Sequence, residues 1–160
     1  MKIQKMKFKF LTLLTIVFFI SINSADLSNR ESTDFELLVH KTPTCGCCKM
    51  WVKHIEENGF ITQIRDHTNL NSIKETYDIK PEYRSCHTSV SSNGFIFEGH
   101  IPAKFIEQFL SEEHPNAIGL SVPGMPLGSP GMEFEGRFMP YDVLILFKDG
   151  TSKVYAEVRK

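Results

Sequence analysis

The sequence has few cysteines, little net charge and no hydrophobic segment long enough to span a bilayer, and these shortages argue against particular classes of protein. Its four cysteines do not form two separated Cys-x-x-Cys pairs, the usual arrangement of a closed all-cysteine zinc site. Its one long apolar run, Phe10 to Ile22, falls short of the roughly 20 residues that span a bilayer. No internal repeat or second domain is visible, and 160 residues with 41% hydrophobic content suffice for one compact domain.

The first 25 residues have the composition of a signal peptide. Ser24 and Ala25 follow the apolar run, where cleavage is expected; an uncleaved anchor is the alternative. No cysteine lies near this position, so a lipid has no attachment point. We therefore expect residues 1–25 to be a signal peptide and the protein to be periplasmic, with no stable membrane insertion after cleavage. The basic residues that precede the apolar run are Lys2, Lys5, Lys7 and Lys9.

Removal of this segment makes the chain acidic. It takes away four of the 18 basic residues and none of the 19 acidic ones, which leaves 14 basic against 19 acidic residues and a net charge of −5. That balance argues against a nucleic-acid partner and is compatible with binding of cations. In an oxidising compartment four thiols would by default form two disulfides, so a metal, a reductant or a redox cycle is needed to keep them functional.

Three of the four cysteines lie within four residues, between a predicted strand and a predicted helix. Cys45 and Cys48 form a Cys-x-x-C spacing at the helix N-terminus, where the helix dipole favours thiolate. Cys47 adds a third sulfur that a simple dithiol does not need. Three soft donors on one turn favour a soft metal ion. Thiol exchange alone and a structural disulfide are the alternatives, although the vicinal Cys47-Cys48 pair would be strained as a bridge.

Hydrophobic patterning predicts an α/β, thioredoxin-like domain over residues 35–158, with the order β-α-β-α-β-β-α. The helix after the cysteine turn should begin with Thr44 as its N-cap. A Met/Gly/Pro-rich loop is expected over 119–136, followed by a C-terminal β-hairpin of strands 143–147 and 152–158. The expected strands and helices before the loop are, in chain order, 35–40, 47–58, 60–65, 70–77, 86–90, 95–98 and a helix that begins at Pro102.

Superposing this order on a thioredoxin places His87 where thioredoxins have the cis-proline that faces the dithiol. Cys86 and His87 would then face Cys45 and Cys48 across the site. Because that proline helps thioredoxins to engage peptide substrates, its replacement argues against simple disulfide exchange and favours a cage of metal ligands.

Several separate motifs resemble the CopG-type family of exported CxCC metal-binding proteins associated with copper resistance. The resemblance implies a thioredoxin-like fold, copper as the metal and a redox role in the handling of periplasmic copper. It extends from about residue 35 to residue 158. The motifs that carry it are Cys45-Gly46-Cys47-Cys48-Lys49, Cys86-His87, Gly99-His100-Ile101-Pro102, Gly124-Met125-Pro126 and Gly128-Ser129-Pro130-Gly131-Met132-Glu133.

The donor set favours Cu(I) over zinc. Met125 and Met132 lie in the aperiodic loop, and neutral thioethers suit Cu(I), although packing in a gap is the alternative. His87 is expected to be a ligand or to support one. His100, which precedes the helix at Pro102, is expected to anchor or cap rather than to bind the metal. Met50 and Trp51 are expected in the core. The other histidines are expected at the surface: His40, His54, His67 and His114.

The sequence therefore predicts an exported protein that binds Cu(I) for copper resistance, with one or several ions bridged by thiolates. Cycling between Cu(I) and Cu(II), as in a copper oxidoreductase, is an extension of this prediction, and other periplasmic copper-handling proteins would be its partners. A thiol-disulfide oxidoreductase or copper metallochaperone partner that uses Cys45 and Cys48 is one alternative, and a binding module with structural disulfides is another. The predicted metal ligands are Cys45, Cys47, Cys48, Cys86, His87, Met125 and Met132.

Overall fold

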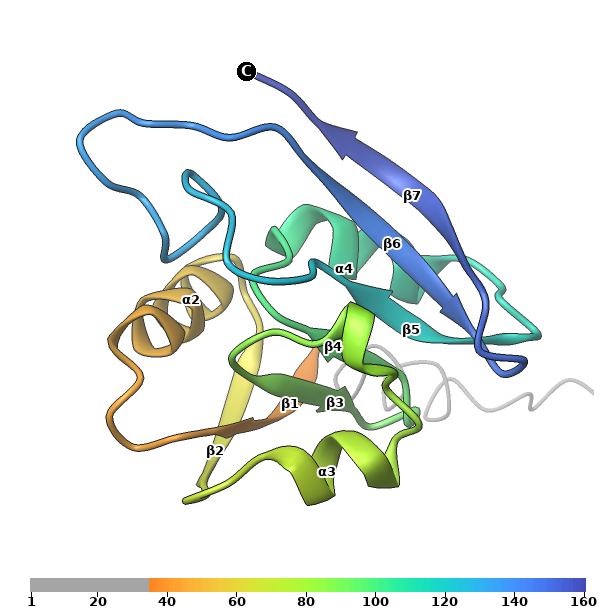
Figure 1. Ribbon diagram of the computed structural model, residues 1–160. Coiled ribbons are helices and arrows are strands. Elements are labelled where there is room, and N and C mark those ends of the chain that lie inside the picture. Colours follow the sequence, from red (N-terminus) through yellow and green to blue (C-terminus); the bar gives the residue numbers. More distant parts are fainter. Residues whose placement is uncertain (1–34) are drawn as a thin grey trace, which may run out of the picture.

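The computed structural model describes residues 35–160, so the predicted signal peptide, 1–25, lies outside the described residues. The described chain forms one mixed sheet with helices packed against it (Figure 1). Its elements, in chain order, are β1 (Glu36–Lys41), α2 (Gly46–Glu57), β2 (Ile61–Asp66), α3 (Asn71–Thr76), a 3-10 turn η1 (Pro81–Tyr83), β3 (Thr88–Ser91), β4 (Ile96–Glu98), α4 (Ala103–Ser111), β5 (Ala117–Ser121), β6 (Tyr141–Phe147) and β7 (Ser152–Val158).

The seven strands are ordered β2-β1-β3-β4-β5-β6-β7. β1 pairs parallel with β2 and antiparallel with β3, and the short β3–β4 hairpin is also antiparallel. β4 pairs parallel with β5, and β6 then joins β5 and β7 in antiparallel fashion. Apart from the 3-10 turn η1, the predicted order of the seven strands and helices from β1 to α4 is confirmed. The predicted C-terminal hairpin is also confirmed, and it extends the same sheet.

The strand β5 was not predicted, because its five residues fell partly inside the expected loop over 119–136. Gly119 interrupts its apolar pattern for a structural reason. A Cβ at Gly119 would lie 1.8 Å from the carbonyl oxygen of Ile96 on the neighbouring strand, so only glycine allows β5 to pair there. β5 is the strand that joins the C-terminal hairpin to the rest of the sheet. The irregular connection covers 122–140.

The core has two parts because successive residues of a strand point to opposite faces of a sheet. Phe97 contributes to the larger cluster together with Trp51 and Ile55 of α2 and side chains of α4. Ile96, the next residue along β4, belongs to a smaller cluster with Ile79, Val90 and Leu146. Trp51 is fully buried, as predicted.

The prediction for Met50 is wrong, because its side chain is 53% exposed. The apolar stripe of α2 follows Cys48, Trp51, Val52 and Ile55, at three- and four-residue intervals, and Met50 falls on the other side of the helix. Among the helices of residues 35–160, none combines the length and the apolar character that a membrane span requires.

Candidate metal centre

The first turn of α2 places a sulfur atom at the positive end of the helix dipole. Cys45, not the predicted Thr44, is the N-cap, and its Sγ accepts a hydrogen bond from the backbone N–H of Cys48 at 3.3 Å. A hydrogen bond of 3.2 Å from the Cys45 N–H to the carbonyl oxygen of Thr42 closes the preceding turn. The helix N-terminus therefore stabilises negative charge on Cys45.

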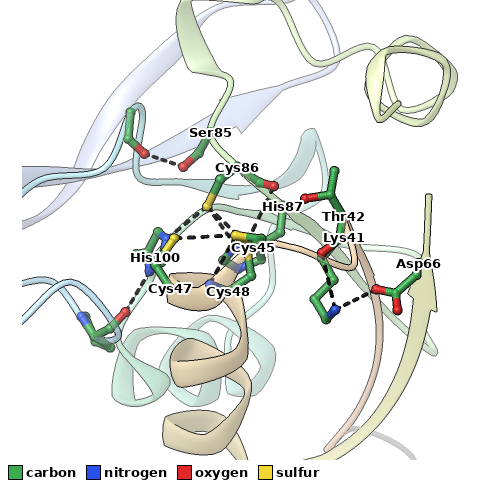
Figure 2. Close-up of a disulfide and its surroundings, with 12 residues drawn as sticks. Lys41, Thr42, Cys45, Cys47, Cys48, Asp66, Ser85, Cys86, His87 and His100 are labelled. Atoms are coloured by element: carbon green, nitrogen blue, oxygen red, sulfur yellow. Dashed lines mark hydrogen bonds and ion pairs between the residues drawn. A yellow bond between two sulfur atoms is a disulfide. The ribbon is translucent and has the colours of Figure 1, made fainter. Parts of the chain in front are cut away.

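The structure brings all four cysteines together (Figure 2). Cys45 and Cys48 form a disulfide, and Cys47 and Cys86 are free. Sγ of Cys47 lies 3.4 Å from Sγ of Cys45, and Sγ of Cys86 lies 3.4 Å from Sγ of Cys48. The four sulfurs all lie within 4.8 Å of one another. The three-plus-one set that the sequence suggested is thus one compact cluster.

Two buried histidines extend the cluster on the side of Cys86. Nδ1 of His87 lies 3.4 Å and Nε2 of His100 lies 3.0 Å from Sγ of Cys86. Cys86 and His87 directly precede β3 rather than starting it, and the carbonyl oxygen of His87 accepts a hydrogen bond of 3.0 Å from the Gly99 N–H. His100 is held by a 2.7 Å contact between Nδ1 and the carbonyl oxygen of Pro130, which agrees with its expected anchoring role. Its contact with Cys86 was not predicted.

His87 is a buried imidazole beside Cys86. The residue is fully buried, and its ring lies 4.3 Å from the Trp51 ring and 5.1 Å from the His100 ring, centroid to centroid. Its Nε2 has no hydrogen-bond partner among residues 35–160. Burial lowers the pKa of His87 well below its usual value, with smaller effects from His100 and Lys74, so the ring is neutral as a metal ligand must be.

Cys86 is held as a thiol in the metal-free protein. Burial raises its pKa to about 12, and the neighbouring Cys47 adds to this shift. A metal that binds Cys86 must therefore displace its proton. Sulfur and imidazole together form a donor set that suits soft or borderline ions such as copper.

The loop over 122–140 lies beside the N-terminal part of α2 (Figure 1). A Cβ at Gly131 would lie 2.6 Å from the carbonyl oxygen of Cys47. Gly124 forms a bridge with Ser85, whose hydroxyl donates to the Gly124 carbonyl oxygen. Each of these glycines precedes a predicted methionine ligand, so the loop brings the backbone of Met125 and Met132 to the edge of the cluster. The Met125 side chain is 51% exposed, and that of Met132 is partly buried.

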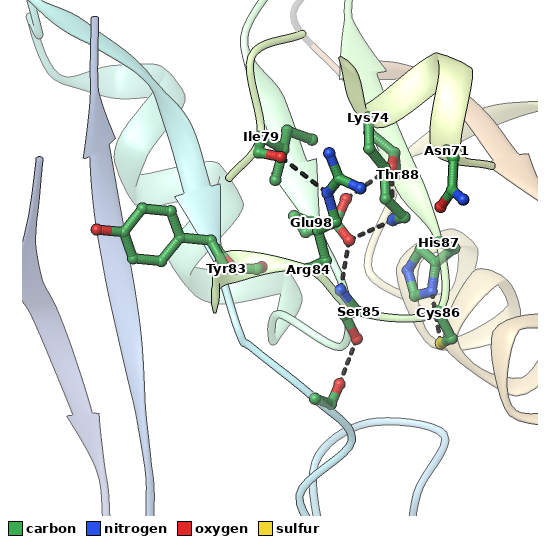
Figure 3. Close-up of polar contacts among 12 residues, drawn as sticks. Asn71, Lys74, Ile79, Tyr83, Arg84, Ser85, Cys86, His87, Thr88 and Glu98 are labelled. Atoms are coloured by element: carbon green, nitrogen blue, oxygen red, sulfur yellow. Dashed lines mark hydrogen bonds and ion pairs between the residues drawn. The ribbon is translucent and has the colours of Figure 1, made fainter. Parts of the chain in front are cut away.

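A buried ion pair supports the turn that carries Cys86, and sequence patterning did not predict it. Glu98 and Lys74 form a salt bridge, and Thr88 donates to Glu98 at 2.6 Å (Figure 3). Oε1 of Glu98 also accepts a hydrogen bond of 2.5 Å from the backbone N–H of Ser85. Both charged side chains are almost completely buried. The pair therefore holds the backbone of Ser85, the residue before Cys86, in place.

The expectation that the remaining four histidines lie at the surface is wrong for His40, which is buried, and His54, His67 and His114 are partly buried. His40 is 5% exposed, and its Nδ1 lies 2.8 Å from Nε2 of His67. His114 stacks on the Phe109 ring at 4.0 Å between centroids. His54 is partly buried and accepts a hydrogen bond from the Ala103 N–H at 3.1 Å.

Because several histidines are buried, we expect the stability of the protein to depend on pH. Burial is the main cause that lowers the pKa of His40, His87 and His100 below the usual value of 6.5. Below about pH 6.5 the unfolded chain therefore binds more protons than the native protein. The stability that these neutral histidines contribute is fully present above that pH and is lost as the pH falls. Each histidine contributes up to about 1.4 kcal/mol per pH unit. We expect the midpoint temperature of thermal unfolding of the metal-free protein to be lower at about pH 5 than at about pH 7.

A control variant, His40→Phe, removes one of these groups and should reduce the slope of the free energy of unfolding against pH. Denaturant titrations of both proteins at several pH values give the two slopes. Equal slopes in the two proteins would contradict the assignment of His40 as a neutral buried group.

A second prediction concerns the contact between the loop and α2. In Gly131→Ala the added Cβ would collide with the backbone of Cys47 and Trp51, and the residue has a φ of +82°. We expect the loop to leave its position and the free energy of unfolding to fall by about 2 kcal/mol or more. Gly136→Ala is the matched control, because Gly136 has a φ of +67° and no atom within 4 Å of the added Cβ. Thermal unfolding compares the two, and an equal loss in both would contradict the loop contact.

The chain is similar to a protein family and to two solved structures. A search of the curated proteins gave no match. The model of a protein family of unknown function, DUF411, matches residues 83–132, a segment that includes Cys86, His87 and His100 but not the cysteines of α2. Two solved structures match with a TM-score of 0.73.

Both are structures of a copper resistance protein CopG. Form 2 is 39% identical over 78% of this chain and 98% of its own, and Form 1 is 37% identical over 79% of this chain and 98% of its own. The predicted resemblance is confirmed: the chain belongs to the CopG-type family.

Proposed function

We propose that the protein is an exported copper-binding protein that serves copper resistance. Its copper ligands are Cys45, Cys47, Cys48 and Cys86, assisted by His87, Met125 and Met132. The observation that carries the proposal is the cluster of four sulfurs within 4.8 Å of one another. Family membership supports copper as the metal, because the two matching structures are of a copper resistance protein.

The donor atoms fit a soft ion. Thiolates, imidazole and thioethers are ligands that favour Cu(I) over hard cations, and the unpartnered Nε2 of the buried His87 supplies one further donor. Four thiolates become available only when the Cys45–Cys48 disulfide has taken up two electrons. Close sulfurs can bridge metal ions, which supports binding of more than one copper ion. Bound copper would supply one-electron chemistry between Cu(I) and Cu(II).

The fold proposal rests on the order of elements. Apart from η1, the strands and helices from β1 to α4 follow the β-α-β-α-β-β-α order of thioredoxin-like domains, with the disulfide at the start of the helix after the first strand. In this proposal β5, the loop over 122–140 and the β6–β7 hairpin extend a thioredoxin-like domain, and the loop covers its active-site end. Export by the segment 1–25 and transfer of copper to periplasmic proteins belong to the same proposal.

Two cysteine substitutions test the ligand assignment. Cys45→Ser and Cys86→Ser each remove one thiolate, and we expect each to lower the number of Cu(I) ions retained per chain under anaerobic dialysis. Met139→Leu is the control, because Met139 is a methionine of the same loop that is 53% exposed and is not a proposed ligand. Retention of the full copper complement by both cysteine variants would refute the assignment.

A second candidate function rests on the disulfide itself. Cys45 and Cys48 form a bonded pair at a helix N-terminus, the position that favours thiolate and exchange. The protein would then reduce or oxidise thiols of other exported proteins, or act with a copper metallochaperone. This candidate predicts turnover in an insulin-reduction assay without metal. Lack of activity of the fully reduced, metal-free protein would count against it.

A further inference from the structure

We propose that the metal-free protein carries out an internal thiol–disulfide exchange in which Cys86 attacks the Cys45–Cys48 disulfide at Cys48. The exchange moves the disulfide from the N-terminus of α2 to a bond between α2 and the turn before β3. It assigns a role to His100, which the proposed copper function does not use. The exchange is independent of that function, because it involves no metal.

The attacked sulfur is placed next to the attacking one. Sγ of Cys86 lies 3.4 Å from Sγ of Cys48, about the contact distance of two sulfur atoms. Cys48 is fully buried, and Cys86 is partly buried. An external thiol therefore reaches Cys48 less easily than Cys86 does. The salt-bridged Glu98 fixes the Ser85 backbone and keeps Cys86 in this position.

The attacking thiol has a base of defined orientation. Nδ1 of His100 lies 2.7 Å from the carbonyl oxygen of Pro130, and a carbonyl oxygen only accepts, so Nδ1 carries the proton. Nε2 is then the unprotonated nitrogen, and it lies 3.0 Å from Sγ of Cys86 (Figure 2). Because Cys86 is a thiol in the metal-free protein, it must lose its proton as it attacks, and Nε2 of His100 is placed to accept that proton.

The leaving sulfur is also prepared for its role. Cys45 caps α2, and its Sγ accepts the hydrogen bond from the Cys48 N–H, so the thiolate that leaves is stabilised by the helix N-terminus. A stabilised thiolate is the better leaving group in disulfide exchange. The turn of residues 45–48 therefore favours attack at Cys48, with Cys45 as the leaving sulfur.

The step is balanced without an oxidant or a reductant. The Cys86 thiol gives its proton to Nε2 of His100 and forms a bond to Sγ of Cys48, while the bond between Cys48 and Cys45 breaks and Cys45 leaves as thiolate. The number of free thiols is unchanged. In the product Cys45 and Cys47 are the two free cysteines, and their sulfurs lie 3.4 Å apart in the present structure.

The test uses the variant Cys47→Ser without metal, because it has one disulfide and a single free thiol. The position of that thiol reports the exchange: it is Cys86 before the step and Cys45 after it. The oxidised variant is prepared in acid, transferred to neutral buffer and quenched with acid at set times. The free thiol is then alkylated and located by peptide mass spectrometry.

The expected result is a growing share of label on Cys45, together with a Cys48–Cys86 linked peptide. In the same background His100→Gln should slow this change by tenfold or more, since one general base contributes about 10²- to 10⁴-fold. Label that stays on Cys86 alone, or appears on Cys48, would overturn the proposal. If circular dichroism shows that Cys47→Ser does not fold, the same labelling is done on the wild-type protein. Transfer of label from Cys86 to Cys45 would again support the proposal, and its absence would overturn it.

Discussion

Reduction of the Cys45–Cys48 disulfide is expected to raise the affinity for Cu(I) by more than 100-fold. The oxidised protein offers two free thiols, Cys47 and Cys86, and the reduced protein offers four. Loss of a residue that only supports a ligand costs about 10- to 100-fold in metal affinity, and loss of two ligands should cost more. Competition with a Cu(I) chelator under anaerobic conditions measures both affinities.

The control for this prediction is the variant Cys45→Ser/Cys48→Ser, which lacks both disulfide sulfurs. Its affinity should match that of the oxidised protein whether or not a reductant is present. If the oxidised and reduced wild-type proteins bound Cu(I) equally, the sulfurs of the helix turn would not be ligands and the proposed site would be wrong.

Lys74→Met is expected to lower the free energy of unfolding by about 3 to 5 kcal/mol, the usual cost of leaving one partner of a buried pair uncompensated. Glu98 is fully buried, and burial raises its pKa even though Lys74, Thr88 and the Ser85 N–H all favour its charged form. Without Lys74 the carboxyl group of Glu98 must either become protonated or move into solvent. Because Ser85 precedes Cys86, the copper site should also lose affinity.

Two controls separate this effect from a general loss of charge. Lys53→Met breaks an exposed i,i+4 pair with Glu57 and should cost about 0 to 1 kcal/mol. Lys74→Met/Glu98→Gln removes both charges but keeps an acceptor for the Ser85 N–H, so it should recover most of the stability. Urea unfolding of the three variants gives the values. A double variant as unstable as Lys74→Met would show that the buried charge is not the cause.

The candidate site could be predicted where the pattern is local. The three cysteines of the helix turn, and the strand and helix beside them, are encoded within about a dozen residues. The position of Cys86 opposite them followed from the order of elements and is confirmed by the sulfur contacts. Their roles as ligands, and those of His87, Met125 and Met132, remain proposals.

The parts that could not be predicted depend on contacts between distant residues. His100 meets Cys86 because Pro130 holds its ring, 30 residues away in the sequence. Lys74 and Glu98 lie 24 residues apart, and each looks like an ordinary surface charge in its own element. β5 was missed because Gly119, which allows it to pair with β4, also breaks its pattern. Periodicity reports which side of an element is buried and not which side chains meet there.

The most direct test of the copper proposal is the copper content of the reduced protein measured together with its free thiols. The protein is purified without oxygen, loaded with Cu(I), dialysed and treated with an alkylating reagent. The proposal predicts at least one tightly held copper ion per chain and protection of all four cysteines from alkylation. Absence of retained copper, with Cys45 and Cys48 free to form their disulfide, would contradict it and favour the thiol-disulfide oxidoreductase.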